Sequence, residues 1–152
     1  MARLLSGTLL GNARVSAGDP RFLDLLDQTL RRIPTGASPI STVTEVRLEL
    51  RGKRRGLVGL TTWGRTGGAH RQVLTFYRDL LGQLSDGAAK AVIVHEIAHA
   101  WLNENVRPED SREREDQADD LARRWGFGDE LRALDEETET IWESPESRRF
   151  SW

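Results

Sequence analysis

The stretch from residue 88 to residue 102 constrains the fold most, because it is apolar on almost every side of a helix. A helix without a polar face cannot lie on the surface of a globular protein, so other elements must surround it. We therefore expect a helix that begins at about Asp86 and runs through the middle of the domain. Its apolar positions are Ala88, Ala89, Ala91, Val92, Ile93, Val94, Ile97, Ala98, Ala100, Trp101 and Leu102.

The length of the chain is sufficient for one such domain. Domains cluster at about 100 to 150 residues, and this chain has 152. Hydrophobic residues make up 38% of the chain and charged residues 30%, which fits a globular protein and is too apolar for a wholly disordered one. We expect one domain over residues 1–140 and a C-terminal tail over residues 141–152.

Composition also narrows the location and the chemistry. No segment approaches the roughly 20 apolar residues that cross a bilayer, so a membrane is not an expected partner. Ser6, Gly7 and Thr8 interrupt the first leucines, which disfavours a secretory signal and favours a cytoplasmic location. The chain has no cysteine, which excludes disulfides and thiolate chemistry and leaves imidazole, carboxylate and hydroxyl groups.

Charge is divided unevenly along the chain. Residues 1–78 contain 13 basic and 5 acidic side chains, whereas residues 79–152 contain 9 basic and 19 acidic ones. A basic half can indicate contact with nucleic acid, but it can equally indicate that two halves of one domain attract each other. The basic residues are spread out, which favours the second interpretation. The densest group is Arg51, Lys53, Arg54 and Arg55.

The N-terminal half is expected to contribute a helix and a sheet. Asp19 as N-cap, Pro20 at the first helical position and Pro34 as the stop bound an amphipathic helix. Imperfectly alternating apolar residues indicate a strand over 42–51, and a basic turn at 52–56 is expected to join it as a hairpin to a second strand over 57–63. After a glycine-rich turn at 64–68, β-branched and aromatic residues predict a third strand over 71–78.

Two more helices are expected after the apolar one, over 110–126 and 128–140. Asp110 and Glu113 fit a capping box, and Gly126 or Gly128 fits a C-terminal stop. Together these elements predict an α+β fold, in which a small mixed twisted sheet packs on helices.

Three ionisable residues interrupt the apolar helix: His95, Glu96 and His99. At about 100° per residue they fall at roughly 0°, 100° and 40°, so they share one side of the helix. Histidines one turn apart can bring both ring nitrogens to one ion at the zinc distance of about 2.1 Å, and Glu96 is then placed as a general base. Ordinary buried polar residues would instead need a compensating network. His70, in the glycine-rich turn, is expected to be a solvated loop residue.

A catalytic zinc needs a third protein ligand. Leu102 and Asn105 occupy the positions where metzincins place a glycine and a further histidine, so that route is excluded. The alternative is a carboxylate of the following helix. When successive residues of that helix are placed about 100° apart, Glu115 borders its buried apolar stripe. Asp119 lies about 40° further around the helix, beside Glu115. It is expected to hold the second ring nitrogen of a ligand histidine. The carboxylates predicted to point to solvent include Glu113, Asp116 and Asp120, interleaved with Arg112 and Arg114.

The double motif His95-Glu96-x-x-His99 and Glu115-x-x-x-Asp119 resembles that of the gluzincin metallopeptidases. The resemblance covers about residues 57–126. It implies a zincin-like domain in which His95, His99 and Glu115 bind one Zn²⁺ and Glu96 polarises the attacking water. It also implies that Asp119 orients a ligand histidine. The short chain is most similar to the small single-domain members, the minigluzincins or the ImmA/IrrE-type peptidases.

The resemblance also gives the sheet a role. In that clan an edge strand aligns the peptide substrate, and the strand over 57–63 would take this position, with Leu60, Thr61, Thr62 and Trp63 as substrate-binding residues. No residue matches the clan's transition-state-stabilising His or Tyr, so His70, Tyr77 and the arginines stay unassigned candidates. Some small members block their own cleft, and the aromatic tail over 141–152 is a candidate for such a segment.

These patterns predict a zinc metalloendopeptidase that acts on peptides or proteins. The rival is a non-catalytic zinc-binding regulatory or DNA-contacting protein on the same fold, with the basic turn at Arg51, Lys53, Arg54 and Arg55 as its contact. Only the uneven distribution of charge supports that rival.

Overall fold

A computed structural model gives the fold. It describes residues 2–4, 8–11, 13–16, 18–50, 59–66, 69–106 and 111–141, and for 2–4, 59–66, 69–70, 111–112 and 140–141 it describes the backbone alone. The described elements are β1 (Ala2–Leu4), β2 (Arg14–Ser16), α1 (Pro20–Arg32), β3 (Val43–Glu49), β4 (Gly59–Thr66), β5 (Ala69–Tyr77), α2 (Arg78–Leu81), α3 (Asp86–Asn105), α4 (Ser111–Arg124) and α5 (Gly128–Ile141).

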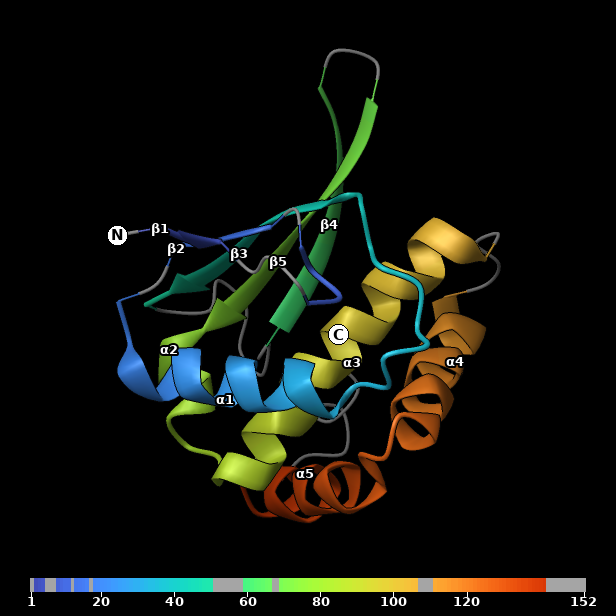
Figure 1. Ribbon diagram of the computed structural model, residues 1–152. Helices are drawn as coiled ribbons and strands as arrows, with labels where there is room; N and C mark the ends of the chain where they lie inside the picture. The colour runs from blue at the N-terminus through green and yellow to red at the C-terminus, as the bar shows by residue number, and fades with distance from the viewer. Residues whose placement is uncertain are drawn as a thin grey trace.

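The strands form one mixed sheet in the order β1-β2-β3-β5-β4. The three inner strands run parallel, and β1 and β4 join antiparallel at the two ends. Helices accompany this sheet in a mixed α/β architecture, so the expected small mixed sheet packed on helices is confirmed. As predicted, β4 is an edge strand, and its hairpin with β5 projects beyond the other strands (Figure 1).

The predicted hairpin between the strands over 42–51 and 57–63 is wrong. β3 pairs with β2 along one edge and with β5 along the other, so β4 cannot pair with it. The antiparallel partner of β4 is β5, and Thr66 pairs with Ala69 across a connection of only two residues, Gly67 and Gly68. A two-residue Gly-Gly connection is a strong hairpin signal, and it outcompetes the longer basic connection. The predicted turn at 64–68 is correspondingly shorter, and His70 lies in β5 instead of a loop.

The apolar helix is α3, and its central position is confirmed. It contacts α1, β4, β5, α4 and α5, and Figure 1 shows it crossing the centre of the molecule. Every residue from 91 to 100 is buried. Because residues 91–100 are all buried, a polar group among them is surrounded by protein and not by bulk water.

The predicted helix ends are confirmed where they are described. Asp19 caps α1, with its side chain accepting a hydrogen bond from the Phe22 amide at 3.1 Å. Gly126 ends α4 with a φ of 97°, and the amides of Gly126 and Phe127 bond the carbonyls of Arg123 and Ala122. This is the Schellman arrangement, which favours glycine at the left-handed position. The predicted capping role of Asp110 falls outside the described residues.

Two further predictions concern the ends of the chain and membranes. The tail over 142–152 lies outside the described residues, and α5 runs to Ile141. Within the described part of the chain, no helix combines the length and the hydropathy that crossing a bilayer requires.

Candidate metal centre

His95 and His99 lie one turn apart on the enclosed helix α3. Their exposed fractions are 2% and 5%, and their ring centroids are 4.6 Å apart with the planes at 81°. The spacing of four residues places both rings on the same side of α3. Two imidazoles so close to each other within the protein need polar partners.

Helix α4 supplies these partners. Glu115 Oε2 lies 3.1 Å from His95 Nε2, and Glu115 Oε1 lies 3.0 Å from His99 Nε2. Two fully buried alanines of α4, Ala118 and Ala122, have side chains small enough to let α4 approach a neighbouring helix closely. One carboxylate therefore touches the Nε2 atoms of both histidines.

Asp119, one turn further along α4, contacts the opposite side of His95. Its Oδ1 lies 2.8 Å from His95 Nδ1. The carboxylates that helical phase predicted to point to solvent, Glu113, Asp116 and Asp120, are exposed, while Glu115 and Asp119 are half-buried. The exposed and half-buried carboxylates of α4 are thus the ones that their angular positions predict.

Three of these residues have the donor set of a metal site. One donor atom from each of His95, His99 and Glu115 lies within 4.8 Å of the others. Ligands about 2.0 to 2.1 Å from a tetrahedral ion are about 3.3 Å from each other, close to the observed contacts of 3.0 and 3.1 Å. The contact between His99 Nε2 and Glu115 Oε1 also lacks hydrogen-bond alignment.

Proton counting at His95 supports the same conclusion. Carboxylate oxygens only accept hydrogen bonds, so the two ring nitrogens facing Asp119 and Glu115 must both carry a proton, or a cation must replace one of them. With the Nδ1 proton held by Asp119, Nε2 is the position for that cation. The residues therefore fit a divalent metal.

The same contacts shift two pKa values. Burial alone would lower the pKa of His95, but hydrogen bonds to Asp119 and Glu115 outweigh burial and raise it to about 9. Burial alone would raise the pKa of Glu115, but contacts with His95 and His99 outweigh burial and lower it to about 2. In the absence of a metal, the site is therefore an imidazolium next to a carboxylate.

Glu96 follows His95 directly and is fully buried. The electrostatic effect of its carboxylate reaches Tyr77, at the end of β5. Burial raises the pKa of the Tyr77 hydroxyl, and the carboxylates of Glu49 and Glu96 raise it further. Tyr77, an unassigned candidate from the sequence, is thus within electrostatic range of the predicted general base.

The remaining predicted residues fall on β4 or outside the described structure. Leu60, Thr61, Thr62 and Trp63 lie in the edge strand β4, whose backbone alone is described. His70 pairs with Arg65 in the β4–β5 hairpin, and its side chain is likewise not described. Arg51, Lys53, Arg54 and Arg55 lie outside the described residues.

Arg114 was expected on the solvated face of α4, and this is wrong. It is only 8% exposed, and within the described part of the chain its Nη1 and Nη2 have no hydrogen-bond partner. The signal was available in the sequence. When the residues of α4 are placed about 100° apart, Arg114 falls between Leu121 and Trp125 on the buried stripe.

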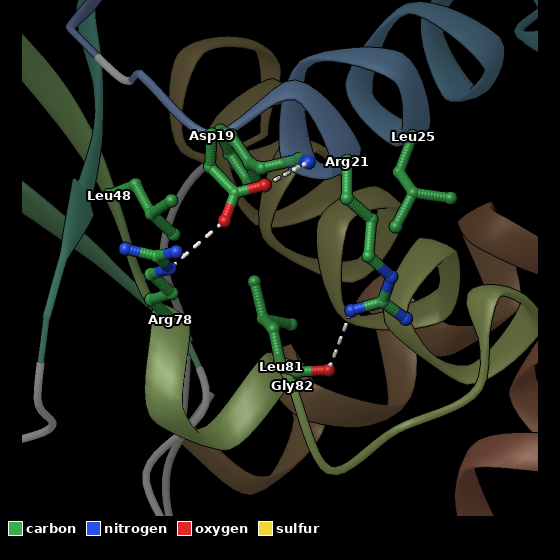
Figure 2. A pocket seen from close by; sticks show the side chains of 8 residues that line it. Asp19, Arg21, Leu25, Leu48, Arg78, Leu81 and Gly82 are labelled. Atoms are coloured by element: carbon green, nitrogen blue, oxygen red, sulfur yellow. Dashed lines mark hydrogen bonds and ion pairs between the residues drawn. The ribbon is translucent and has the colours of Figure 1, made fainter.

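A separate hollow of about 260 Å³ lies between α1, α2 and β3 (Figure 2). Arg78 Nε pairs with Asp19 Oδ2 at 3.0 Å, and Arg21 Nη1 donates to the Leu81 carbonyl at 3.1 Å. Both arginines thus hold α1 against the α2 region. The hollow contains none of the residues of the candidate metal centre.

No protein-family model matches the chain, and no curated protein or solved structure is significantly similar to it. The relation to gluzincins therefore stays a resemblance carried by the motif residues and by the cluster that they form.

Proposed function

We propose that the protein is a zinc-dependent metallopeptidase that hydrolyses bonds within peptides or proteins. The observation that carries this proposal is the shared carboxylate of Glu115, which touches the Nε2 atoms of both His95 and His99. Three convergent donors from two helices are the ligand set of a catalytic zinc, because they leave a fourth position for water or substrate.

The choice of zinc rests on the donor types. Two imidazoles and one carboxylate suit Zn²⁺, whereas Mg²⁺ and Ca²⁺ prefer oxygen ligands alone. When bound, zinc lowers the pKa of a coordinated water to about 7 and polarises a carbonyl group. Glu115 and the two histidines would hold the ion, and Asp119 would keep the proton of His95 on Nδ1 so that Nε2 is free to bind.

Glu96 is the proposed general base. Its carboxylate would accept a proton from the attacking water and pass it to the leaving amine nitrogen. Its position on α3, about 100° around the helix from His95, supports a role beside the ligands and not as one of them.

The edge strand β4 is the proposed site of substrate alignment. One side of β4 pairs with β5, which leaves its other side as an end of the sheet. An extended peptide can add to such an edge through backbone hydrogen bonds. The contact between α3 and β4 supports this placement, because it brings the strand next to the helix that bears the ligands.

The proposal is tested by peptide cleavage under metal control. Purified protein is incubated with a mixed peptide library after chelator treatment, and again after addition of one equivalent of zinc. Cleavage that depends on zinc supports the peptidase. Stoichiometric zinc without cleavage would favour the non-catalytic rival, which a salt-sensitive DNA shift would then identify.

A further inference from the structure

Gln72 is a buried polar residue of the sheet strand β5. It lies on β5 on the same face as Leu74 and Phe76, and all three side chains are fully buried. A buried amide is costly unless its donors and acceptor are satisfied, so a glutamine at a core position needs a reason.

The amide of Gln72 joins three elements. Its Nε2 donates to Thr42 Oγ1 at 2.9 Å and to the carbonyl of Ala100 at 3.0 Å. Its Oε1 accepts from Asn103 Nδ2 at 3.0 Å. The side chain thereby links the residue before β3, the strand β5 and the helix α3.

A second contact from α3 reaches the same place. Glu104 Oε1 accepts hydrogen bonds from the Thr42 amide at 2.9 Å and from the Ser41 amide at 2.9 Å. The backbone amide of Gln72 also donates to the Thr42 carbonyl at 2.8 Å. The C-terminal part of α3 is thus attached to the sheet by several directional bonds around Thr42.

These bonds lie close to the candidate metal centre. Ala100 directly follows His99, and Asn103 is one turn beyond it. Across the hairpin, Gln72 pairs with Trp63 of the edge strand β4. Gln72 therefore hydrogen-bonds to the helix that bears the ligands, and its strand lies next to the proposed substrate edge.

We propose that Gln72 is a positioning residue that fixes α3 relative to β4, and with it the zinc ligands relative to the aligned peptide. The inference rests on the proposed function. Apolar attraction is not directional, whereas amide hydrogen bonds restrict both distance and angle and so add to packing in fixing a helix on a sheet. A displacement of about 1 Å in a reacting group can reduce turnover by about 100-fold.

Metal binding and turnover should respond differently to the loss of the Gln72 hydrogen bonds. All three ligand residues lie on α3 and α4, so metal binding does not depend on where the sheet lies. Gln72→Met keeps the length of the side chain and removes its hydrogen bonds. We expect this variant to bind zinc as the natural protein does, with an unchanged Co²⁺ absorption spectrum, while kcat falls about 10- to 100-fold.

Phe76→Leu is the matched control. Phe76 is buried on the same face of β5, but its ring packs on Phe22 of α1. It should lose stability with little change in kcat. Asn103→Leu removes only the hydrogen bond to Gln72 Oε1, at a partly buried position. This variant should fold even if Gln72→Met fails to fold, and its loss of kcat should be smaller.

Two inhibitors supply a readout that a purely structural role would not change. Acetohydroxamate, which contacts little beyond the metal, should bind Gln72→Met as it binds the natural protein. A peptidyl hydroxamate, which also needs the edge strand, should bind about 10-fold more weakly. Equal losses of activity in Gln72→Met and Phe76→Leu would overturn the role of Gln72 and leave the peptidase proposal standing. A natural protein that binds zinc and cleaves nothing would overturn both.

Discussion

Asp119 Oδ1 lies 2.8 Å from Nδ1 of His95, while Nε2 of the same ring faces Glu115. The aspartate therefore decides which nitrogen of His95 carries the proton and which one can bind a metal. Oriented in this way, a ligand histidine binds more tightly than a freely rotating one, because neither tautomer nor ring orientation has to be selected at the moment of binding.

Asp119→Ala should therefore weaken zinc binding without abolishing it. We expect a loss of about 10- to 100-fold in affinity, measured by competition with a chromophoric chelator. Asp120→Ala is the control, because the neighbouring carboxylate is exposed and pairs with Arg123 instead. Equal affinities in the two variants would show that Asp119 does not support the site.

Glu96→Gln should retain zinc and lose turnover. The amide has nearly the same shape as the carboxylate but cannot accept the proton of the attacking water, so kcat should fall by about 10²- to 10⁴-fold. Zinc content and melting temperature are measured beside the cleavage rate. A variant that cleaves peptides at the natural rate would remove Glu96 from the mechanism.

The stability of the metal-free protein should depend on pH through two groups. The pKa of His95 is raised from 6.5 to about 9, so its contribution is complete below pH 6.5 and is lost as the pH rises to about 9. The pKa of Glu115 is lowered from 4.5 to about 2, so its contribution is complete above pH 4.5 and is lost as the pH falls to about 2.

Thermal unfolding of chelator-treated protein should thus show a plateau between about pH 4.5 and 6.5 and a fall on either side. In Glu115→Gln the fall above pH 6.5 should be smaller, because the imidazolium has lost a charged partner. A melting temperature that stays constant from pH 6.5 to about 9 in the metal-free protein would contradict the assigned contacts of His95.

Arg114→Met should stabilise the protein. Burial of two guanidinium nitrogens without partners among the described residues costs free energy, and methionine fills a similar volume without that cost. We expect the free energy of unfolding to rise by about 1 to 3 kcal/mol, seen as a higher denaturant midpoint. Arg124→Met, at an exposed position of the same helix, should change it little. A destabilised Arg114→Met would show that the guanidinium has a partner.

Helical features were the most predictable from sequence. The period of α4 placed Glu115 on the border of its buried stripe, Asp119 beside it and Asp116 in solvent, and Gly126 was one of two glycines predicted to end the helix. These are local properties, since a helix satisfies its own backbone and leaves only its faces to be assigned. The burial of Arg114 was not predicted, because arginine is charged, although its angular position on α4 lies within the buried stripe.

The sheet was less predictable, because strand pairing is not local. Local sequence patterns located β3, β4 and β5 but could not show that β5 inserts between β3 and β4. The strands β1 and β2 have three residues each, too few for alternation to be read. Gln72 was missed for a related reason, since its partners Thr42, Ala100 and Asn103 become visible only when β5 is packed against α3.

The central claim is that His95, His99 and Glu115 hold one divalent ion, and zinc K-edge X-ray absorption tests it most directly. The zinc-loaded protein should show one ion per chain, with two imidazole nitrogens and a carboxylate oxygen at about 2.0 to 2.2 Å. Glu115→Ala should lose the ion, whereas Asp116→Ala, at an exposed position of the same helix, should keep it. A natural protein that stays metal-free in excess zinc, or a Glu115→Ala variant with full occupancy and an unchanged spectrum, would contradict the account.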